Sequence, residues 1–347
     1  MVTNNAEQYL KAIKGKYPIR NVSYDPEYYL GNNIERKQNK TIKYQIYIYI
    51  YICEVLSNYE SETSDLKKEK VPMSGGDHPK LDESPELSNE EQTKYQSYIG
   101  ILQWIVTSGR FDIAYAVTSL SRFNSRPREG HMKRIRKIFG YLKKYPNRGF
   151  VINPQDFNPI PSNEKLEPDF GNQYADFSEE IDEKLPVPKM KELSTTILVD
   201  SDHGHDRKTG RSITGMISFV GQTPIYWSSK RQGAVQTTTF GAEFTALKKA
   251  VEEAVTMRYY LRSMGVLVTK PSVIYGDNLS AIVNVTDPGS QLNKKYLALS
   301  YHYCREHFSA GIVDIRKIDG KDNCSDALTK ALNGSEFHSH FSEISEH

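Results

Sequence analysis

The stretch TTILVDSD, residues 195–202, places Asp200 directly after a short run of β-branched and aliphatic residues. Such a run predicts a buried strand, with Asp200 at its end. The stretch SVIYGDN, residues 272–278, repeats the pattern, with Asp277 after a second β-rich run. Strand ends are rigid and therefore suit metal ligands. The two stretches predict a sheet that carries a carboxylate at the end of each of two strands.

Two further acidic residues lie near predicted helix starts, Glu243 in GAEFTAL and Asp326 in NCSDALTK. Four carboxylates that converge repel one another unless a cation neutralises them. Mg²⁺ takes oxygen ligands, and two such ions can activate a water and relieve charge on a leaving oxygen. The set therefore predicts two divalent ions and phosphodiester hydrolysis. In this hypothesis Asp200 bridges both ions, Glu243 and Asp277 complete one site, and Asp326 holds the other.

Each acidic residue taken alone also has a purely structural explanation. An aspartate at a strand end usually caps a turn or stays solvated. A glutamate near a helix start is favoured by the helix dipole, and Asp326 could simply follow an N-cap at Asn323. It is the set of four, in one order of elements, that favours a metal site.

Residues 194–333 have the pattern of one α/β domain. Short β-rich runs are interspersed with apolar residues at helical spacing. The predicted strands are 195–199, 213–220, 224–228, 272–275 and 312–318, and the predicted helices are 241–263, a short one around 281–282, 294–309 and 323–332. The order βββαβααβα predicts a mixed five-stranded sheet flanked by helices.

The rest of the chain divides into segments of different character. Residues 90–145 have three apolar stripes at helical spacing, which predicts a small helical bundle. Tyr and Ile alternate from 46 to 52, which predicts a strand over 44–52 before a short helix over 53–60. The predicted division is 1–75, an N-terminal part; 76–150, the bundle; 151–193, a Pro-rich acidic linker; 194–333, the α/β domain; and 334–347, a flexible tail.

Composition limits the class of protein. The 347 residues carry a formal net charge of +2, so any basic surface must be local. Cys53, Cys304 and Cys324 are far apart, which argues against a zinc ribbon or a disulfide framework and favours a reducing compartment. The N-terminus lacks the apolar region of a signal peptide, and the most apolar run, 46–52, is too short to cross a bilayer. We therefore expect no membrane contact.

Five motifs together carry a resemblance to a known family. They are YQSYIGILQWIVTSGRFDIAYAVTSLSRF (95–123), GRSITGMISFVGQTPIYWSSKRQ (210–232), GAEFTAL (241–247), IYGDNLSAI (274–282) and SDALTKAL (325–332). Over most of residues 20–333, the chain resembles the C-terminal part of the Pol polyprotein of copia-type LTR retrotransposons. The resemblance implies a ribonuclease H-like fold for 194–333, the end of a reverse transcriptase palm with a connector in 1–75, and a thumb- or connection-like bundle in 76–150.

The resemblance also implies an activity. It implies a ribonuclease H-type endonuclease that cleaves the RNA strand of RNA–DNA hybrids. Asp200, Glu243, Asp277 and Asp326 would be its catalytic and metal-binding carboxylates, with Mg²⁺ as the ion and Mn²⁺ as an alternative. The implied partners are the hybrid and other Pol or Gag products. The implied location is intracellular, in a cytoplasmic virus-like particle and in the nucleus. Oligomeric state is left open.

The chain departs from the family pattern at several positions. Gly241 stands where a second glutamate normally precedes the catalytic one, and Tyr296, Ala298 and Ser300 replace a His, an Asp and an Arg. A Tyr-x-Asp-Asp motif, which a polymerase needs for its metal ligands, does not occur in the sequence. The alternative function is therefore a catalytically inactive retroelement fragment that at most binds nucleic acid.

Candidate nucleic-acid contacts lie mainly in one basic segment. HMKRIRKIFGYLKKYPNR, residues 131–148, fits either a surface that tracks phosphates or the solvated outer face of a helix. Its candidate residues are Lys133, Arg134, Arg136, Lys137, Lys143 and Lys144, and the resemblance adds Asn278 and His302.

Other candidates are weaker. RKTGR, residues 207–211, fits a polar hairpin turn better than a phosphate contact. His203-x-His205 lacks further ligands at a spacing suited to zinc. His338 and His340, in the predicted tail, are weaker metal ligands still.

Overall fold

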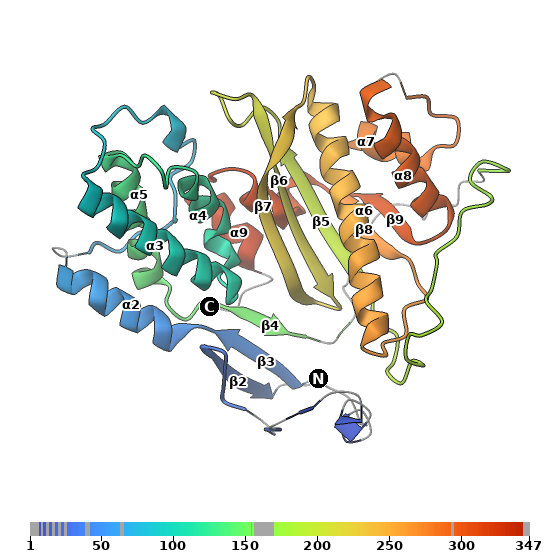
Figure 1. The fold of residues 1–347 in the computed structure, drawn as a ribbon, viewed down its shortest axis with the longest axis horizontal. Coiled ribbons are helices and arrows are strands. Elements are labelled where there is room, and N and C mark those ends of the chain that lie inside the picture. Colours follow the sequence, from blue (N-terminus) through green and yellow to red (C-terminus); the bar gives the residue numbers. More distant parts are fainter. Residues whose placement is uncertain are drawn as a thin grey trace.

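Two β-sheets and two groups of helices make up the described part of the chain (Figure 1). The computed structural model describes residues 26–38, 42–62, 66–153, 170–292 and 295–342, with Gln155 and scattered positions among the first 23 residues. In Figure 1 the N-terminal helices lie to the left of the larger sheet, and the smaller sheet lies below. None of the described helices combines the length and the apolar character needed to cross a bilayer.

The larger sheet has five strands. They are β5 (Thr195–Asp202), β6 (Arg211–Val220), β7 (Thr223–Val235), β8 (Ser272–Gly276) and β9 (Val313–Lys317), in the order β7-β6-β5-β8-β9. β5, β6 and β7 pair antiparallel, whereas β8 is parallel to β5 and to β9. Parallel neighbours need crossover connections, which the helices supply. The predicted architecture, a mixed five-stranded sheet flanked by helices and preceded by a small helical bundle, is confirmed.

The two faces of this sheet belong to different hydrophobic cores. Side chains alternate along β5, so that neighbouring residues face opposite sides. Ile197 and Val199 pack with the helices α6 (Thr239–Ser263), α7 (Leu279–Thr286) and α8 (Ala298–Ser309). Leu198 belongs to a second core, which continues into the N-terminal helices. Asp200, two residues after Leu198, lies on the side of this second core.

The N-terminal helices form the predicted bundle. They are α2 (Tyr49–Glu62), α3 (Asn89–Thr107), α4 (Ala114–Ser121) and α5 (Glu129–Lys144), with the 3-10 turns η1 (Pro79–Leu81) and η2 (Phe111–Ile113). Ser88 and Glu91 cap α3 reciprocally, and the Ser88 N–H donates to the Glu91 carboxylate at 3.0 Å. The core of the bundle is continuous with one face of the larger sheet. The division into separate domains stays a prediction.

The strand predicted over 44–52 is wrong in its second half. β3 (Ile42–Tyr47) ends at Tyr47, and α2 begins at Tyr49. Ile48, Ile52 and Tyr59 are buried in the bundle core, at a spacing that places them on one face of a helix. Burial of this helical stripe outweighs the local alternation of Tyr and Ile.

The segment 151–193 is not a free linker where the structure describes it. β4 (Phe150–Ile152) pairs with β3 and completes a small sheet with β1 (Tyr28–Tyr29) and β2 (Asn32–Gln38), in the order β1-β2-β3-β4. Glu179 accepts hydrogen bonds of 2.6–2.8 Å from Arg258 and Arg262 of α6. Phe170 is buried among the helices on the same side. Residues 154 and 156–169 lie outside the described residues.

The C-terminal part also differs from the prediction. The helix predicted over 323–332 is only a 3-10 turn, η5 (Cys324–Leu328), which follows the turns η3 (Lys295–Leu297) and η4 (Gly320–Asp322) along the chain. Residues 334–342, predicted within a flexible tail, form α9 (Gly334–Ser342). Phe337 and Phe341 are buried in the bundle core, and this apolar contact holds the helix in place. Residues 343–347 lie outside the described residues.

Candidate active site

Asp200 and Asp277 follow paired positions on neighbouring parallel strands. Leu198 of β5 pairs with Tyr275 of β8, and each aspartate comes two residues later. Residues two apart share a face of a sheet, so both carboxylates lie on the same side. One oxygen each of Asp200, Asp277 and Glu243 lies within 4.8 Å of the other two. We call these three residues the carboxylate cluster.

Glu243 reaches the cluster from α6. Thr238 caps this helix, its hydroxyl accepting the Gly241 N–H at 3.1 Å. Because the helix begins at Thr239, Glu243 lies in its second turn and not in the first turn as predicted. α6 packs against β5, and this contact sets Glu243 beside Asp200.

Asp326 approaches the same face from η5. The Asn323 side chain donates to the Val199 carbonyl at 3.0 Å and accepts from the Ser325 hydroxyl at 2.7 Å. The Thr329 hydroxyl donates to an Asp200 carboxylate oxygen at 2.7 Å. These bonds fix the turn to β5 beside the cluster.

Gly215 makes room for this turn. It pairs with Asp200 in the register of β5 and β6. A Cβ at Gly215 would lie 2.5 Å from the Ser325 carbonyl oxygen, well inside normal contact. A strand glycine often marks such a close approach of another backbone segment. The glycine is therefore a requirement of the site, although the sequence analysis did not single it out.

The carboxylates raise one another's pKa values. Burial, followed by the charges of Asp326 and Asp277, raises the pKa of Asp200 to about 7. Burial, followed by the charges of Asp200 and Asp277, raises the pKa of Glu243 to about 9. Burial and Asp326 also raise the pKa of Asp277. Either bound protons or a bound cation can relieve this crowding.

The donor atoms of the cluster fit a hard divalent cation. All three residues offer carboxylate oxygens, which suit Mg²⁺ and Mn²⁺. Asp326 is placed differently from the other three predicted carboxylates. Its oxygens lie 2.6 Å from Lys330 Nζ and 3.9 Å from His340 Nε2. Asp326 thus shares the face of the cluster but already has a cationic partner.

Sequence reasoning did not assign Thr329, Lys330 or His340 to this site. Thr329 and Lys330 lie within SDALTKAL, so that motif contained the information. His340 reaches Asp326 only because α9 buries its phenylalanines in the bundle core. No local pattern shows that contact.

Two basic residues of α5 hold the connector that precedes α3. Arg134 pairs with Asp77 at 2.8 Å and with Asp82 at 2.5 Å. Lys137 donates to the Ser74 hydroxyl at 2.6 Å. These contacts give Arg134 and Lys137 a structural role, whatever else they bind.

The other basic candidates of α5 differ in exposure. Lys143 pairs with Glu60 of α2 at 2.6 Å. Lys144 lies over the Tyr145 ring, with Nζ 5.4 Å from its centroid. Arg136 is half-buried, whereas Lys133 is exposed to solvent. Nucleic-acid contact by this helix stays a prediction.

The two candidates from the resemblance also have internal partners. Asn278, which follows Asp277 directly, caps α7 by accepting the Ala281 N–H at 3.0 Å. His302 of α8 bonds through Nδ1 to the Tyr174 hydroxyl at 2.7 Å. Asn278 therefore adjoins the carboxylate cluster, whereas His302 contacts the segment before β5.

Two departures from the family pattern lie against each other. A Cβ at Gly241 would lie 2.6 Å from the Tyr296 hydroxyl. The same hydroxyl lies 3.4 Å from that of Thr237. A larger residue at 241 would have to displace Tyr296, so the two changes are sterically matched.

The sequence is similar to curated transposon proteins. It is 27% identical over 294 residues to the retrovirus-related Pol polyprotein from transposon RE1 of Arabidopsis thaliana, covering 85% of this chain and 17% of that protein. For the Pol polyprotein from transposon RE2 of the same species, the identity is 25% over 272 residues, covering 78% and 16%. The chain is therefore similar in sequence to the Pol polyproteins of transposons. The predicted resemblance is thereby confirmed.

The chain spans less than a fifth of the length of the RE1 and RE2 polyproteins. It is also 26% identical over 226 residues to the transposon Ty5-1 protein of Saccharomyces cerevisiae, covering 65% of this chain and 60% of that protein. No family model matches the chain.

Solved ribonuclease H structures overlap with part of the chain. The N-terminal RNase H domain of rv2228c from Mycobacterium tuberculosis is 14% identical, with a TM-score of 0.31, covering 40% of this chain and 96% of that chain. LC11-RNase H1, isolated from compost, is 16% identical with a TM-score of 0.32, covering 39% and 92%.

Proposed function

We propose that the chain is a ribonuclease H-type endonuclease of a retrotransposon polyprotein, which cleaves the RNA strand of RNA–DNA hybrids. The observation that carries the proposal is the convergence of Asp200, Glu243 and Asp277 on one mixed sheet. The relationship to transposon Pol polyproteins supports it. Crowded carboxylates at strand ends suit metal-assisted hydrolysis of a phosphodiester.

The residues of the site have distinct roles in this proposal. Asp200, Glu243 and Asp277 would hold one cation, and Asp200 with Asp326 a second. Bound Mg²⁺, or Mn²⁺ in its place, would supply an activated water and charge relief on the leaving oxygen. The Thr329 hydroxyl orients Asp200 through its hydrogen bond. Because the pKa values of Asp200 and Glu243 are raised, binding of the ions should be accompanied by proton release from this pair of carboxyls.

Hydrolysis adds the water oxygen to phosphorus and breaks the bond to the 3′ oxygen. The products are a 3′-hydroxyl and a 5′-phosphate, as the resemblance implies. Selection of the RNA strand would come from 2′-hydroxyls across a wide, shallow minor groove. Binding by shape and backbone makes few base contacts, so we expect weak sequence preference.

The test is cleavage of an end-labelled RNA–DNA hybrid with Mg²⁺, with RNA and DNA duplexes of the same sequence alongside. We expect cleavage of the hybrid only, and its loss in Asp277→Asn. Asp176→Asn is the matched control, because Asp176 is exposed and lies in the segment before β5. Hybrid binding without cleavage by the unchanged protein would reject the enzyme. Equal cleavage by Asp277→Asn would reject the residue assignment.

One observation favours the second candidate, a catalytically inactive fragment that at most binds nucleic acid. Lys330 Nζ lies 2.6 Å from the Asp326 carboxylate, where it competes with a cation for that ligand. Calorimetric titration of the protein with Mg²⁺ separates the two candidates. An active site should bind Mg²⁺ with proton release, and an inactive one should show no binding that depends on Asp200.

We also propose, from the relationship alone, an intracellular location in virus-like particles and the nucleus, with other Pol or Gag products as partners. Sedimentation of cell extracts tests this location. The protein should co-sediment with particles that contain the RNA of the element, and its recovery only as a free chain would contradict the proposal.

A further inference from the structure

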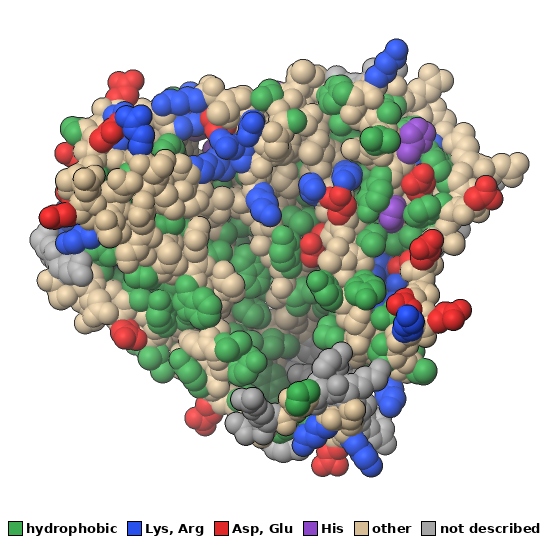
Figure 2. All heavy atoms as spheres, in the orientation of Figure 1, with side chains coloured by type: hydrophobic (Ala, Val, Ile, Leu, Met, Phe, Trp, Pro, Cys, Tyr) green, Lys and Arg blue, Asp and Glu red, His purple; other side chains and the backbone are tan. Residues whose placement is uncertain are grey.

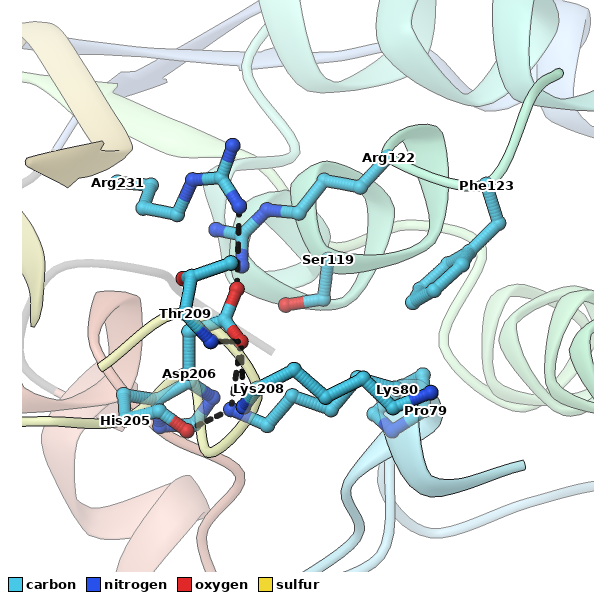
Figure 3. Close-up of a pocket in the computed structure, with 10 residues that line it drawn as sticks. All are labelled: Pro79, Lys80, Ser119, Arg122, Phe123, His205, Asp206, Lys208, Thr209 and Arg231. Carbon is cyan, nitrogen blue, oxygen red and sulfur yellow. Dashed lines mark hydrogen bonds and ion pairs between the residues drawn. The ribbon is translucent and has the colours of Figure 1, made fainter. Parts of the chain in front are cut away.

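A cavity of about 200 Å³ lies between the bundle and the larger sheet. Its walls come from segments that are distant in the sequence: η1, the end of α4, the hairpin that joins β5 to β6, and β7 (Figure 3). Lys80, Arg122, Lys208 and Arg231 line it, together with Asp206. We call these five residues the seam pocket.

The seam pocket has more positive than negative charge. Its four cationic side chains face a single carboxylate, that of Asp206. Arg231 lies 3.1 Å and Lys80 Nζ 3.7 Å from the two oxygens of that carboxylate. Lys80 also donates to the His205 carbonyl. Each oxygen of the Asp206 carboxylate therefore already has a cationic partner, Arg231 or Lys80.

Arg122 is left without such a partner. Its Nη2 is buried and has no hydrogen-bond partner among the described residues. Figure 3 shows its guanidinium beside that of Arg231, above Asp206. Burial and the charge of Arg231 lower the pKa of Arg122. A buried arginine N–H without an acceptor is unfavourable, and an anion in the cavity would satisfy it.

Lys208 lines the cavity from the hairpin that joins β5 to β6. It is exposed, and its side chain makes no ion pair with a described residue. Figure 2 shows lysine and arginine side chains gathered along the upper part of this face, over the bundle and its junction with the sheet. An anion in the cavity would meet the exposed Lys208 and the buried Nη2 of Arg122.

We propose that the seam pocket binds a phosphate group. Its volume is several times the roughly 30 Å³ that one water occupies in the liquid, so there is room for such an anion. An arginine fork matches the oxygens of a phosphate, and Lys208 adds a second charge. The same excess of positive charge rejects a metal cation.

The phosphate could belong to a nucleic-acid backbone or to a free phosphate or nucleotide. The hairpin of the pocket continues β5, the strand that holds Asp200. A nucleic-acid backbone phosphate bound here would position the nucleic-acid strand relative to the carboxylate cluster. Of the two sources of phosphate, only the nucleic-acid backbone rests on the proposed function. Phosphate binding itself does not require nuclease activity, so the two proposals can fail separately.

The first experiment uses inorganic phosphate and thermal unfolding of the whole chain. Phosphate is compared with chloride at equal ionic strength, for the unchanged protein and for Arg122→Gln, Lys208→Gln and Arg126→Gln. Arg126 is the matched control, with 77% of its side chain exposed outside the pocket. The Lys208 side chain makes no ion pair with a described residue, so its variant should fold even if Arg122→Gln does not.

We expect phosphate to raise the Tm of the unchanged protein and of Arg126→Gln by about 2 °C or more. The rise should disappear in Arg122→Gln and Lys208→Gln. No rise in the unchanged protein, or the same rise in all four proteins, would overturn the proposal.

The second experiment identifies the source. Binding of a labelled RNA–DNA hybrid is measured against salt concentration, with EDTA to prevent cleavage. If the backbone supplies the phosphate, each pocket variant should reduce the salt slope by about one. If the salt slopes of the pocket variants match that of Arg126→Gln, while these variants lose the rise in Tm with phosphate, the pocket binds free phosphate or a nucleotide.

Discussion

The carboxylate cluster and the seam pocket both gather like charges, but the two regions can relieve their repulsion in different ways. Asp200 and Glu243 can take up protons, since their pKa values are raised to about 7 and about 9. Arginine stays charged at any pH that a folded protein tolerates. The cluster should therefore respond to pH and divalent cations, and the pocket to salt and anions.

The largest expected effect is at the cluster. Asp200→Asn keeps the shape of the side chain but removes the charge that every proposed ion requires. Loss of partners that only orient metal ligands lowers activity 10–100-fold, so loss of a ligand should lower hybrid cleavage by at least about a hundredfold. Initial rates under saturating Mg²⁺ provide the measurement.

The control for Asp200→Asn is Asp319→Asn, since 68% of the Asp319 side chain is exposed. Cleavage by Asp200→Asn within about threefold of the unchanged protein would show that the cluster is not the site of hydrolysis.

The pH dependence of stability tests the protonation of the cluster. The folded pKa of Glu243, about 9, lies above its ordinary value of 4.5, so the folded chain binds more protons between these values. The stabilisation is complete below about pH 4.5 and is lost as the pH rises through about 9. Glu243→Gln should therefore stabilise the metal-free protein at pH 8, by an amount that grows as the pH rises from about 4.5 toward 9.

Urea unfolding in EDTA, from pH 5 to pH 9, measures this effect. Glu180→Gln, at an exposed position, is the control and should leave the pH profile unchanged. If Glu243→Gln were no more stable than the unchanged protein at pH 8, the carboxylates would not be crowded in the folded state.

A smaller effect should follow from loss of the hydrogen bond to Asp200. Thr329→Val removes the donor at a fully buried position without changing the shape of the side chain much. We expect Mg²⁺ affinity to fall about tenfold, as for other partners of metal ligands. Titration of Mg²⁺ against cleavage rate measures the change. Thr329→Ser keeps the hydroxyl and should restore the affinity, and equal losses in both variants would point to packing.

The smallest expected effect is coupling between the two regions. Their residues come from different segments, except that the hairpin of the pocket continues β5, which holds Asp200. The effects of Asp200→Asn and Arg122→Gln on hybrid affinity should therefore multiply to within about twofold. Equilibrium binding of the single and double variants measures this, and a fivefold departure would mean that the regions act as one site.

The cluster was predictable and the seam pocket was not, for a physical reason. Asp200 and Asp277 each end a β-rich run, and parallel pairing in register brings such positions together. Lys80, Arg122 and Lys208 lie in separate segments with no shared pattern, and only the packing of the bundle on the sheet makes them neighbours. For the same reason the local pattern of RKTGR favours a hairpin turn over a phosphate contact.

Long-range burial also explains the errors in the predicted elements. The alternation of Tyr and Ile over 46–52 favours a strand locally, but burial in the bundle core favours a helix that begins at Tyr49, with Ile48 just before it and Ile52 within it. The polar composition of 334–347 suggests a tail, yet two phenylalanines hold α9 against the same core. A pattern confined to a few residues cannot show which distant surface will cover it.

The core shared by the bundle and the sheet sets a lower limit on the size of an independently folding unit. Leu198, Ile213 and Ile217 on one face of the sheet are covered through the same apolar cluster that fills α3, α4 and α5. A polypeptide that began at residue 194 would leave this face open to water and should self-associate through it. The α/β part thus shares one of its two hydrophobic cores with the bundle. Shortening the chain past the start of α3 should therefore lower its solubility before it lowers its catalytic activity.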